Sequence, residues 1–282
     1  MFQVSSTLLN TCIQRRVPLP GYMRELVEEA IRYIGKPGAG LLVQETMMNF
    51  ASLRADIYNK SLKDPDAIIA RALELDSTLL SIMTNSPQGW EYETVFTDID
   101  SEFVFDGRYH VYYDCWMGYM WNALRSVRIM LNQIIRDTLL EGFSSKPPRF
   151  IDSDHTAQFQ ISTDNLYEFQ ADILASVPHH LGCIAKSKDG SGYLFSWKPR
   201  SDGDMPGVRM HGGSFLLWPL LLAGIMDIAT EKVRNFVYHN LKFIGNTMGI
   251  NEAHVLAKML QMNSDPVEYL NDTTSTPQHD VK

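Results

Sequence analysis

The stretch from residue 112 to residue 140 constrains the fold most, because it carries a helical apolar pattern over about eight turns and contains no proline. A helix of this length has to cover its apolar side chains with other elements. We therefore predict that it is the spine of the fold and that it packs through one apolar stripe. The stripe consists of Cys115, Tyr119, Met120, Ala123, Leu124, Val127, Leu131, Ile134 and Ile135.

Six further segments have the same helical period. The clearest start signal is Asp64, which we predict to cap a helix whose first residue is Pro65. Proline removes a backbone donor and glycine accepts a left-handed conformation, so we predict that Pro178 ends one helix and Gly249 another. The six predicted helices are 40–59, 64–83, 164–177, 213–229, 231–248 and 251–261.

Strand signals are few, with weak alternation at 90–96 and a short aromatic run at 193–197. The simplest architecture is an all-α antiparallel helical assembly, interrupted by two long loops. The first, 85–106, is acidic and aromatic, and the second, 185–213, is rich in glycine and is expected to be exposed and flexible. We predict a single domain over residues 1–262, followed by a polar, disordered tail at 263–282.

Charge and cysteine content narrow the function. The chain has 25 Lys and Arg against 33 Asp and Glu, a net charge of −8, which opposes autonomous nucleic-acid binding. Its three scattered cysteines suit neither a disulfide framework nor a CxxC metal motif, so we expect a reduced, intracellular protein. The first 16 residues lack a signal-peptide core, and the most apolar run, 215–226, is far shorter than the roughly 20 residues that cross a bilayer. We therefore expect no membrane contact.

Two clusters contain metal-ligating residue types. His179, His180 and Cys183 form an HHxxC string, but adjacent histidines point in different directions and no second cluster completes a tetrahedral site. For Cys183 we favour a buried structural role over pairing with a histidine as a nucleophile. The string from Asp152 to His155 follows two prolines, so we interpret it as a solvated loop. We predict no metal and no catalytic residue.

Glycine-rich segments do not supply a nucleotide or calcium site. Residues 35–40 precede a helix, but no strand comes before them and the Lys-Ser/Thr pair of a P-loop is missing, so we predict a turn between helices. Residues 202–204 lack the closing Glu of a calcium loop. No GxSxG motif is present. We therefore predict no cofactor.

One pocket remains a hypothesis. Arg125 and Arg128 lie beside Trp121 on the long helix, where a guanidinium could fix helix packing or hold an anionic ligand between helices. Pro219 inside an apolar helix predicts a kink beside Trp218, and a kink can open a gap for a small apolar molecule. The candidate effector pocket consists of Trp116, Trp121, Arg125, Arg128, His180 and Trp218.

Three strings in this order carry a family resemblance: FVFDGRYHVY at 103–112, ADILASVP at 171–178 and GSFLLWPL at 213–220. The first continues into the long helix through Trp121, Asn122, Arg125 and Arg128. Together they resemble the C-terminal regulatory region of fungal zinc-binuclear-cluster transcription factors, the fungal-specific transcription factor domain. The resemblance covers roughly residues 12–260.

The resemblance implies a nuclear, α-helical regulatory domain that responds to effectors and contacts other transcription proteins or a full-length relative. Members of the family carry a six-cysteine, two-zinc module, which cannot be built from Cys12, Cys115 and Cys183. We therefore expect no direct DNA binding by this chain alone.

Two alternatives stay open. One is a small-molecule-binding protein or enzyme that reuses the helical scaffold, with His179, His180, Cys183 and His211 as its best residues. The other is a protein that acts only through interactions, by pairing with full-length relatives and reducing their activity. The resemblance implies a nuclear location, and if the protein is not nuclear we expect it to be cytoplasmic.

Overall fold

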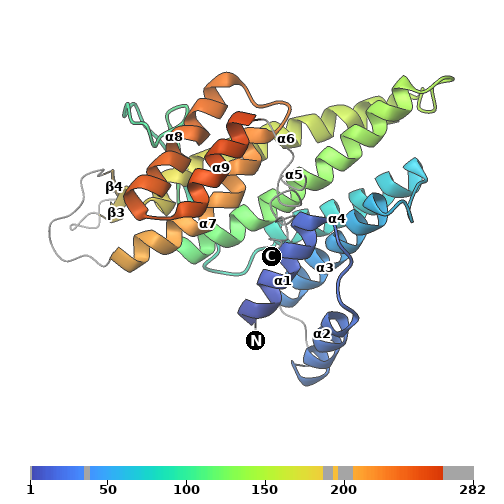
Figure 1. Ribbon diagram of the computed structural model, residues 1–282, viewed down its shortest axis with the longest axis horizontal. Coiled ribbons are helices and arrows are strands. Elements are labelled where there is room, and N and C mark those ends of the chain that lie inside the picture. Colours follow the sequence, from blue (N-terminus) through green and yellow to red (C-terminus); the bar gives the residue numbers. More distant parts are fainter. Residues whose placement is uncertain (1, 35–38, 187–192, 196–205, 263–282) are drawn as a thin grey trace, which may run out of the picture. The chain divides into compact units, whose positions relative to one another are not determined.

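Helices dominate the computed structural model, which describes residues 2–34, 39–186, 193–195 and 206–262 of the 282-residue chain. Within these residues the chain forms nine helices and two antiparallel sheets of two strands each (Figure 1). The prediction of an all-α fold is therefore confirmed. A search of the described helices finds none that is long and apolar enough to span a bilayer.

Backbone contacts divide the chain into two compact units. Among the described residues, the first unit holds 2–85 and 131–162, and the second holds 86–130 and 163–262. Two long helices, α5 (Cys115–Ser144) and α6 (Ser153–His180), contribute residues to both units. The single domain over 1–262 stays a prediction, and the predicted tail at 263–282 lies outside the described residues.

The first unit is built from helices that bury apolar side chains against one another. Helix α3 (Ala39–Tyr58) packs against α1 (Phe2–Arg15) and against α4 (Pro65–Thr84). These contacts remove large aliphatic and aromatic side chains from water, which is the main favourable term in folding. The buried side chains of this unit include Leu9, Ile13, Phe50, Leu53, Leu79, Leu131 and Ile135.

Local signals set the beginning of α4 but not of the earlier helices. Asp64 accepts a hydrogen bond from the backbone nitrogen of Ala67 at 3.2 Å and Pro65 is the first helical residue, as predicted. Both α1 and α2 (Gly21–Ile34) precede the first helix predicted from the sequence. The predicted turn at 35–40 falls mostly outside the described residues, and Ala39 and Gly40 already belong to α3.

Two hairpins belong to the second unit. Strands β1 (Glu93–Phe96) and β2 (Arg108–Val111) pair so that Thr94 lies opposite His110. Strands β3 (Ile184–Lys186) and β4 (Tyr193–Phe195) form the other pair. Strands β1 and β4 fall within the two weak strand signals, whereas β2 and β3 carry no signal that the sequence analysis detected. The first long loop is therefore shorter than predicted.

Three helices form the rest of the second unit: α7 (Pro206–Ile225), α8 (Glu231–Met248) and α9 (Asn251–Met262), which pack on one another. Helix α8 has the predicted bounds, because Thr230 caps its start and Gly249, with φ of 73°, ends it. The predicted exposed loop over 185–213 is partly wrong, since β3, β4 and the start of α7 lie within it, and its residues 187–192 and 196–205 lie outside the described residues. Pro206 is a favoured first helical residue, a signal that the glycine-rich composition obscured.

Helix α5 differs from its prediction in two ways. It begins at Cys115, because Asp114 caps it by accepting a hydrogen bond from the backbone nitrogen of Met117 at 2.8 Å. The single apolar stripe is also wrong, since every residue from 124 to 130 is buried, which includes Arg125 and Arg128. The helix is covered on all sides over two turns, and its buried polar side chains need partners inside the protein.

Helix α6 is much longer than the predicted segment 164–177. It begins at Ser153, where Asp152 accepts a hydrogen bond from the backbone nitrogen of His155 at 2.9 Å, so this string caps a helix and is not a loop. Pro178 lies inside the last turn and does not end the helix. Gly182, with φ of 71°, ends it instead.

The hydrogen bonds beyond α6 are those of a Schellman motif. The backbone nitrogen of Cys183 donates to the carbonyl of Pro178 at 2.9 Å, and that of Gly182 donates to the carbonyl of His179 at 3.1 Å. Pro178 cannot donate to the carbonyl of Leu174. The backbone nitrogen of Leu181 still donates to the carbonyl of Val177 at 3.0 Å, so the helical hydrogen bonds continue past the proline.

Candidate functional site

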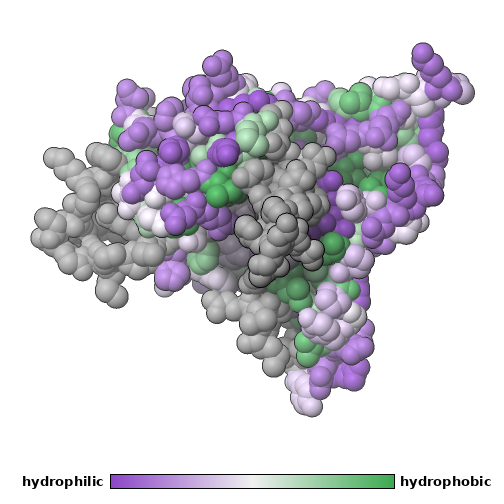
Figure 2. All heavy atoms as spheres, viewed as in Figure 1, coloured by the Kyte–Doolittle hydropathy of each residue, from purple (hydrophilic) through white to green (hydrophobic). Residues whose placement is uncertain are grey.

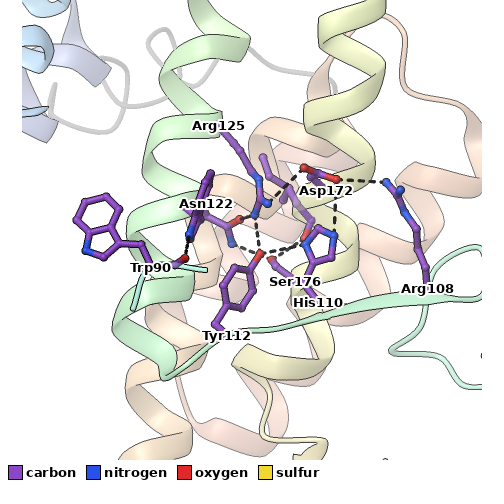
Figure 3. A network of polar contacts seen from close by, with 10 residues as sticks. Trp90, Arg108, His110, Tyr112, Asn122, Arg125, Asp172 and Ser176 are labelled. Atoms are coloured by element: carbon purple, nitrogen blue, oxygen red, sulfur yellow. Dashed lines mark hydrogen bonds and ion pairs between the residues drawn. The ribbon is translucent and has the colours of Figure 1, made fainter. Parts of the chain in front are cut away.

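The guanidinium group of Arg125 is the centre of a buried polar network in the second unit (Figure 3). Its Nη1 donates to the hydroxyl of Tyr112 at 2.6 Å and to Oδ1 of Asn122 at 3.1 Å. Its Nη2 lies 3.3 Å from Oδ2 of Asp172, which projects from α6. The network thus connects the end of the β1–β2 hairpin with α5 and α6.

Aromatic rings surround the same guanidinium. Its central carbon lies 5.0 Å from the ring centre of Tyr92, 5.5 Å from Trp121 and 5.9 Å from Tyr112. The indole nitrogen of Trp121 donates to the backbone carbonyl of Trp90 at 2.7 Å, which fixes that ring. Negative ring faces stabilise a cation that has lost its water, so the rings support the buried charge of Arg125.

Asp172 collects a second group of contacts. Its Oδ1 lies 3.4 Å from Nη2 of Arg108 and 3.7 Å from Nε2 of His110. Nδ1 of His110 in turn lies 3.1 Å from the hydroxyl of Tyr112. Because Arg125 already donates to that hydroxyl, Tyr112 donates its own proton to His110, and Nε2–H of His110 faces Asp172.

His180 occupies a tight site at the end of α6. The amide nitrogen of Asn122 lies 3.2 Å from its Nε2 and donates to the hydroxyl of Ser176 at 2.8 Å. An amide nitrogen only donates, so Nε2 accepts and Nδ1 carries the proton. A Cβ atom on Gly118 would lie 3.0 Å from this ring, and one on Gly212 would lie 2.1 Å from the carbonyl oxygen of His180.

Burial fixes the protonation states of the network. Desolvation raises the pKa of Tyr112 to about 12 and lowers the pKa of His180 to about 3. Desolvation, together with the positive charges of Arg125 and Arg108, lowers the pKa of His110 to about 2. Burial alone would lower the pKa of Arg125, but Tyr112 and Asp172 raise it. At neutral pH the phenol is protonated and both imidazoles are neutral, far from the pKa near 7 that suits general acid–base chemistry.

Two members of the network reach solvent. The side chain of Asp172 is 16% exposed and that of Arg108 is 31% exposed, whereas His110 and Arg125 are fully enclosed. Asp172 and Arg108 therefore form a solvent-facing edge of the network.

The structure brings together half of the candidate effector pocket. Trp121 and Arg125 lie in the network, and His180 joins it through Asn122. Arg128 lies apart, with its guanidinium carbon 4.5 Å from the ring centre of Phe169.

The remaining two candidates belong to other surroundings. Trp116 is 49% exposed and contacts Phe215 of α7 at 5.9 Å between ring centres. Trp218 is half-buried in α7, one residue before Pro219, which lies inside that helix as predicted. The kink and the gap beside Trp218 stay predictions.

The other predicted clusters have structural contacts. Nδ1 of His179 accepts a hydrogen bond from the backbone nitrogen of Tyr112 at 3.3 Å, while Cys183 is buried beyond the end of α6. His211 is exposed in α7, with its ring 6.4 Å from Phe215. The described residues hold no group of three His, Cys, Asp or Glu that could bind a metal ion, and residues 202–204 lie outside them.

Sequence reasoning missed the roles of most residues in this network, namely Arg108, His110, Tyr112, Asn122, Asp172 and Ser176. Tyr112 was expected inside the long helix, but it lies between β2 and α5. Asp172 and Ser176 share one face of α6, being four residues apart, and an acid and a hydroxyl within an otherwise apolar string are a signal of buried polar partners.

Comparisons with known proteins give one match that bears on function. Over 153 residues the chain is 26% identical to "Transcription factor dbaG" of Emericella nidulans, a stretch that covers 54% of this chain. The same stretch covers 32% of the relative, so the chain spans about a third of that protein's length. No protein-family model and no solved structure matches the chain. The similarity relates this chain to a fungal transcription factor.

Proposed function

We propose that this chain is a transcription-regulator domain that acts through contacts with other proteins. The observation that carries the proposal is the similarity to a fungal transcription factor over more than half of the chain. Other transcription proteins or a full-length relative are the partners we propose. The fungal-specific transcription factor domain is the family whose strings the chain resembles.

The network supports this proposal. String 103–112 supplies Arg108, His110 and Tyr112, and string 171–178 supplies Asp172 and Ser176. Segments that carry the family resemblance therefore meet in one buried set of hydrogen bonds and ion pairs. We propose that this network specifies one packing of the helices.

A role without catalysis agrees with the chemistry of the site. The phenol and the two imidazoles of the network have pKa values of about 12, 2 and 3, so none exchanges a proton readily near neutral pH. We propose that these groups hold helices together and that the chain is not an enzyme. Turnover of a substrate by the purified chain that His180→Gln abolishes without unfolding would overturn this.

The decisive experiment fuses the full chain to a heterologous DNA-binding domain and measures a reporter gene in a filamentous fungus. We expect a reproducible change in reporter output relative to the DNA-binding domain alone. No change in either direction, with the fusion expressed and folded, would contradict the proposal. A fluorescent fusion in the same host tests the nuclear location, and exclusion from the nucleus would count against it.

Direct DNA binding is tested separately. We propose that the chain alone does not bind double-stranded DNA. Its net charge is −8, so it lacks the excess of positive charge that would neutralise DNA phosphates. In a gel-shift assay we expect no retention of random or promoter duplexes. Tight, salt-sensitive retention of a defined duplex would contradict this.

A second candidate function is the binding of a small anionic effector at Arg125. Nε and Nη2 of Arg125 and Nδ1 of His180 are buried without a hydrogen-bond partner, although Nη2 faces Asp172 as an ion pair. Unsatisfied buried donors cost stability, and an anion that accepts from them would recover it.

Melting temperatures test this candidate. We expect acetate or benzoate to raise the melting temperature above that in sodium chloride of equal ionic strength, because a ligand that binds only the folded state stabilises it. Equal melting temperatures in the three salts, at concentrations up to tens of millimolar, would remove the effector site from Arg125.

A further inference from the structure

The face drawn in Figure 2 is mixed, with hydrophilic side chains in many places and hydrophobic ones in several. The connection between β1 and β2 exposes apolar side chains. Phe96, the last residue of β1, is 77% exposed, and Ile99 is 42% exposed. Thr94 is exposed as well and Val95 is half-buried between them, so Phe96 lies on the outer face of the hairpin. A phenyl ring this exposed has no packing role in the folded chain.

Acidic side chains flank these two residues. Asp98, Asp100 and Glu102 are exposed, and among the described residues no ion pair neutralises them. The sequence has no lysine or arginine between Arg71 and Arg108. We call Phe96, Asp98, Ile99 and Asp100 the acidic hairpin surface.

The backbone that carries this surface is held in place. The nitrogen of Thr97 donates to the carbonyl of Gly107 at 2.8 Å, and the nitrogen of Ile99 donates to the hydroxyl of Thr97 at 3.1 Å. Gly107 has φ of 66°, and a Cβ there would lie 2.9 Å from the carbonyl oxygen of Thr97, so this close approach requires glycine.

Helix α8 anchors the far side of the connection. The amide of Asn240 donates to the carbonyl of Glu102 at 3.1 Å, and Phe103 is buried with its ring 4.8 Å from that of Phe243. Asp106 pairs with Lys232 of α8. The exposed residues therefore sit on an ordered support and lose little freedom when a partner covers them.

We propose that the acidic hairpin surface is a docking site for a partner protein that presents an amphipathic helix, with an apolar face bordered by lysine and arginine. The inference rests on the proposed function and names the surface through which the protein contacts occur. Phe96 and Ile99 pack on the apolar face of that helix, and Asp98 and Asp100 face its basic border. Complementary charge determines which partner binds and raises the association rate, while Phe96 and Ile99 supply most of the affinity.

A basic amphipathic peptide tests the surface directly. The probe is the acetylated and amidated 14-mer LKKLLKLLKKLLKL with a fluorophore at its end, titrated with the full chain. We expect Phe96→Ala/Ile99→Ala to weaken binding about tenfold. We expect Asp98→Asn/Asp100→Asn to weaken it about fivefold in low salt and much less at about 0.5 M salt, where exposed charges are screened.

Two control variants match these changes elsewhere in the chain. Ile151→Ala removes an exposed aliphatic side chain, and Glu25→Gln/Glu29→Gln removes two exposed acidic charges from α2. Both controls should bind the peptide as the unmodified chain does. All variants change exposed residues, and unchanged melting temperatures show that they fold.

The reporter fusion separates this inference from the proposed function. Loss of reporter output in Phe96→Ala/Ile99→Ala but not in Ile151→Ala supports both. Equal peptide binding by the hairpin variants and their controls overturns the docking surface, even where the unmodified fusion regulates the reporter. A silent unmodified fusion whose hairpin variants lose the peptide selectively overturns the proposed function and leaves the surface standing.

Discussion

Oδ2 of Asp172 on α6 lies 3.3 Å from Nη2 of Arg125 on α5, and the arginine side chain is fully buried. An isolated charge in that position would be unfavourable, because burial removes its water. The carboxylate offsets this cost while Tyr112 and Asn122 accept hydrogen bonds from the same guanidinium. The pair therefore specifies how the two helices face each other. Removing one partner is strongly destabilising, because the other charge then stays buried without compensation.

We expect Asp172→Asn to lower the free energy of unfolding by about 3–5 kcal/mol, because it leaves Arg125 buried without a compensating charge. Urea denaturation followed by circular dichroism measures the loss. Asp56→Asn is the control, since Asp56 pairs with Arg71 in a half-exposed bridge, 3.0 Å long, whose removal should cost about 1 kcal/mol or less. Equal losses in the two variants would mean that Asp172 does not stabilise the buried charge.

A double-mutant cycle separates the pair from its surroundings. Arg125→Met and Asp172→Leu should each destabilise the protein strongly, whereas the double variant should lose less than the sum of the two. The reason is that Arg125→Met removes the buried charge that Asp172→Leu leaves without its carboxylate. Strictly additive losses in urea denaturation would show that the two side chains are not coupled.

Close approach of two helices gives a steric prediction. A Cβ atom at Gly212 would lie 2.1 Å from the carbonyl oxygen of His180, a backbone atom that cannot turn away. Gly212→Ala should therefore cost about 3 kcal/mol, at the upper end for overpacking. Gly40→Ala in α3 is the control, because nothing lies within 4 Å of its added methyl group, and helix propensity should raise stability by up to about 1 kcal/mol. Comparable thermal melts for the two variants would contradict the packing at His180.

The end of α6 gives a prediction that discriminates between two residues. Gly182→Ala should lower the free energy of unfolding by about 1–2 kcal/mol, because φ of 71° strains any side chain. Pro178→Ala should cause no loss, since it adds a backbone donor within the last turn. Chemical denaturation of both variants measures the two changes in the free energy of unfolding. A large loss for Pro178→Ala alone would show that proline, not glycine, ends the helix.

Elements with local end signals could be predicted from the sequence. The bounds of α8 follow from Thr230 and Gly249, and the start of α4 follows from Asp64 and Pro65. The beginning of α6 could not be predicted from periodicity, because residues 153–163 are mostly polar and their apolar period is weak. The cap at Asp152 is a signal there, but it stands beside prolines that indicate a loop.

The network could be predicted only in part. The sequence indicated Arg125 and Trp121, because a guanidinium can stack on a neighbouring indole, and His180, because it belongs to the HHxxC string. It could not supply their partners, since Asn122 meets Ser176 across 54 positions of the chain. Pairings of this length depend on how helices cross, and a periodic pattern contains no such information.

The neutral histidines predict how stability changes with pH. His110 and His180 have pKa values of about 2 and about 3 in the folded protein, against 6.5 for a free side chain. Below pH 6.5 these two histidines bind protons in the unfolded chain but stay neutral in the folded protein. Their contribution to the free energy of unfolding is therefore complete above pH 6.5 and falls as the pH decreases toward 3. Urea denaturation from pH 7.5 to 4.5 should show this fall, and His110→Asn should reduce its slope by up to about 1.4 kcal/mol per pH unit. A slope unchanged by His110→Asn would mean that His110 is protonated in the folded network.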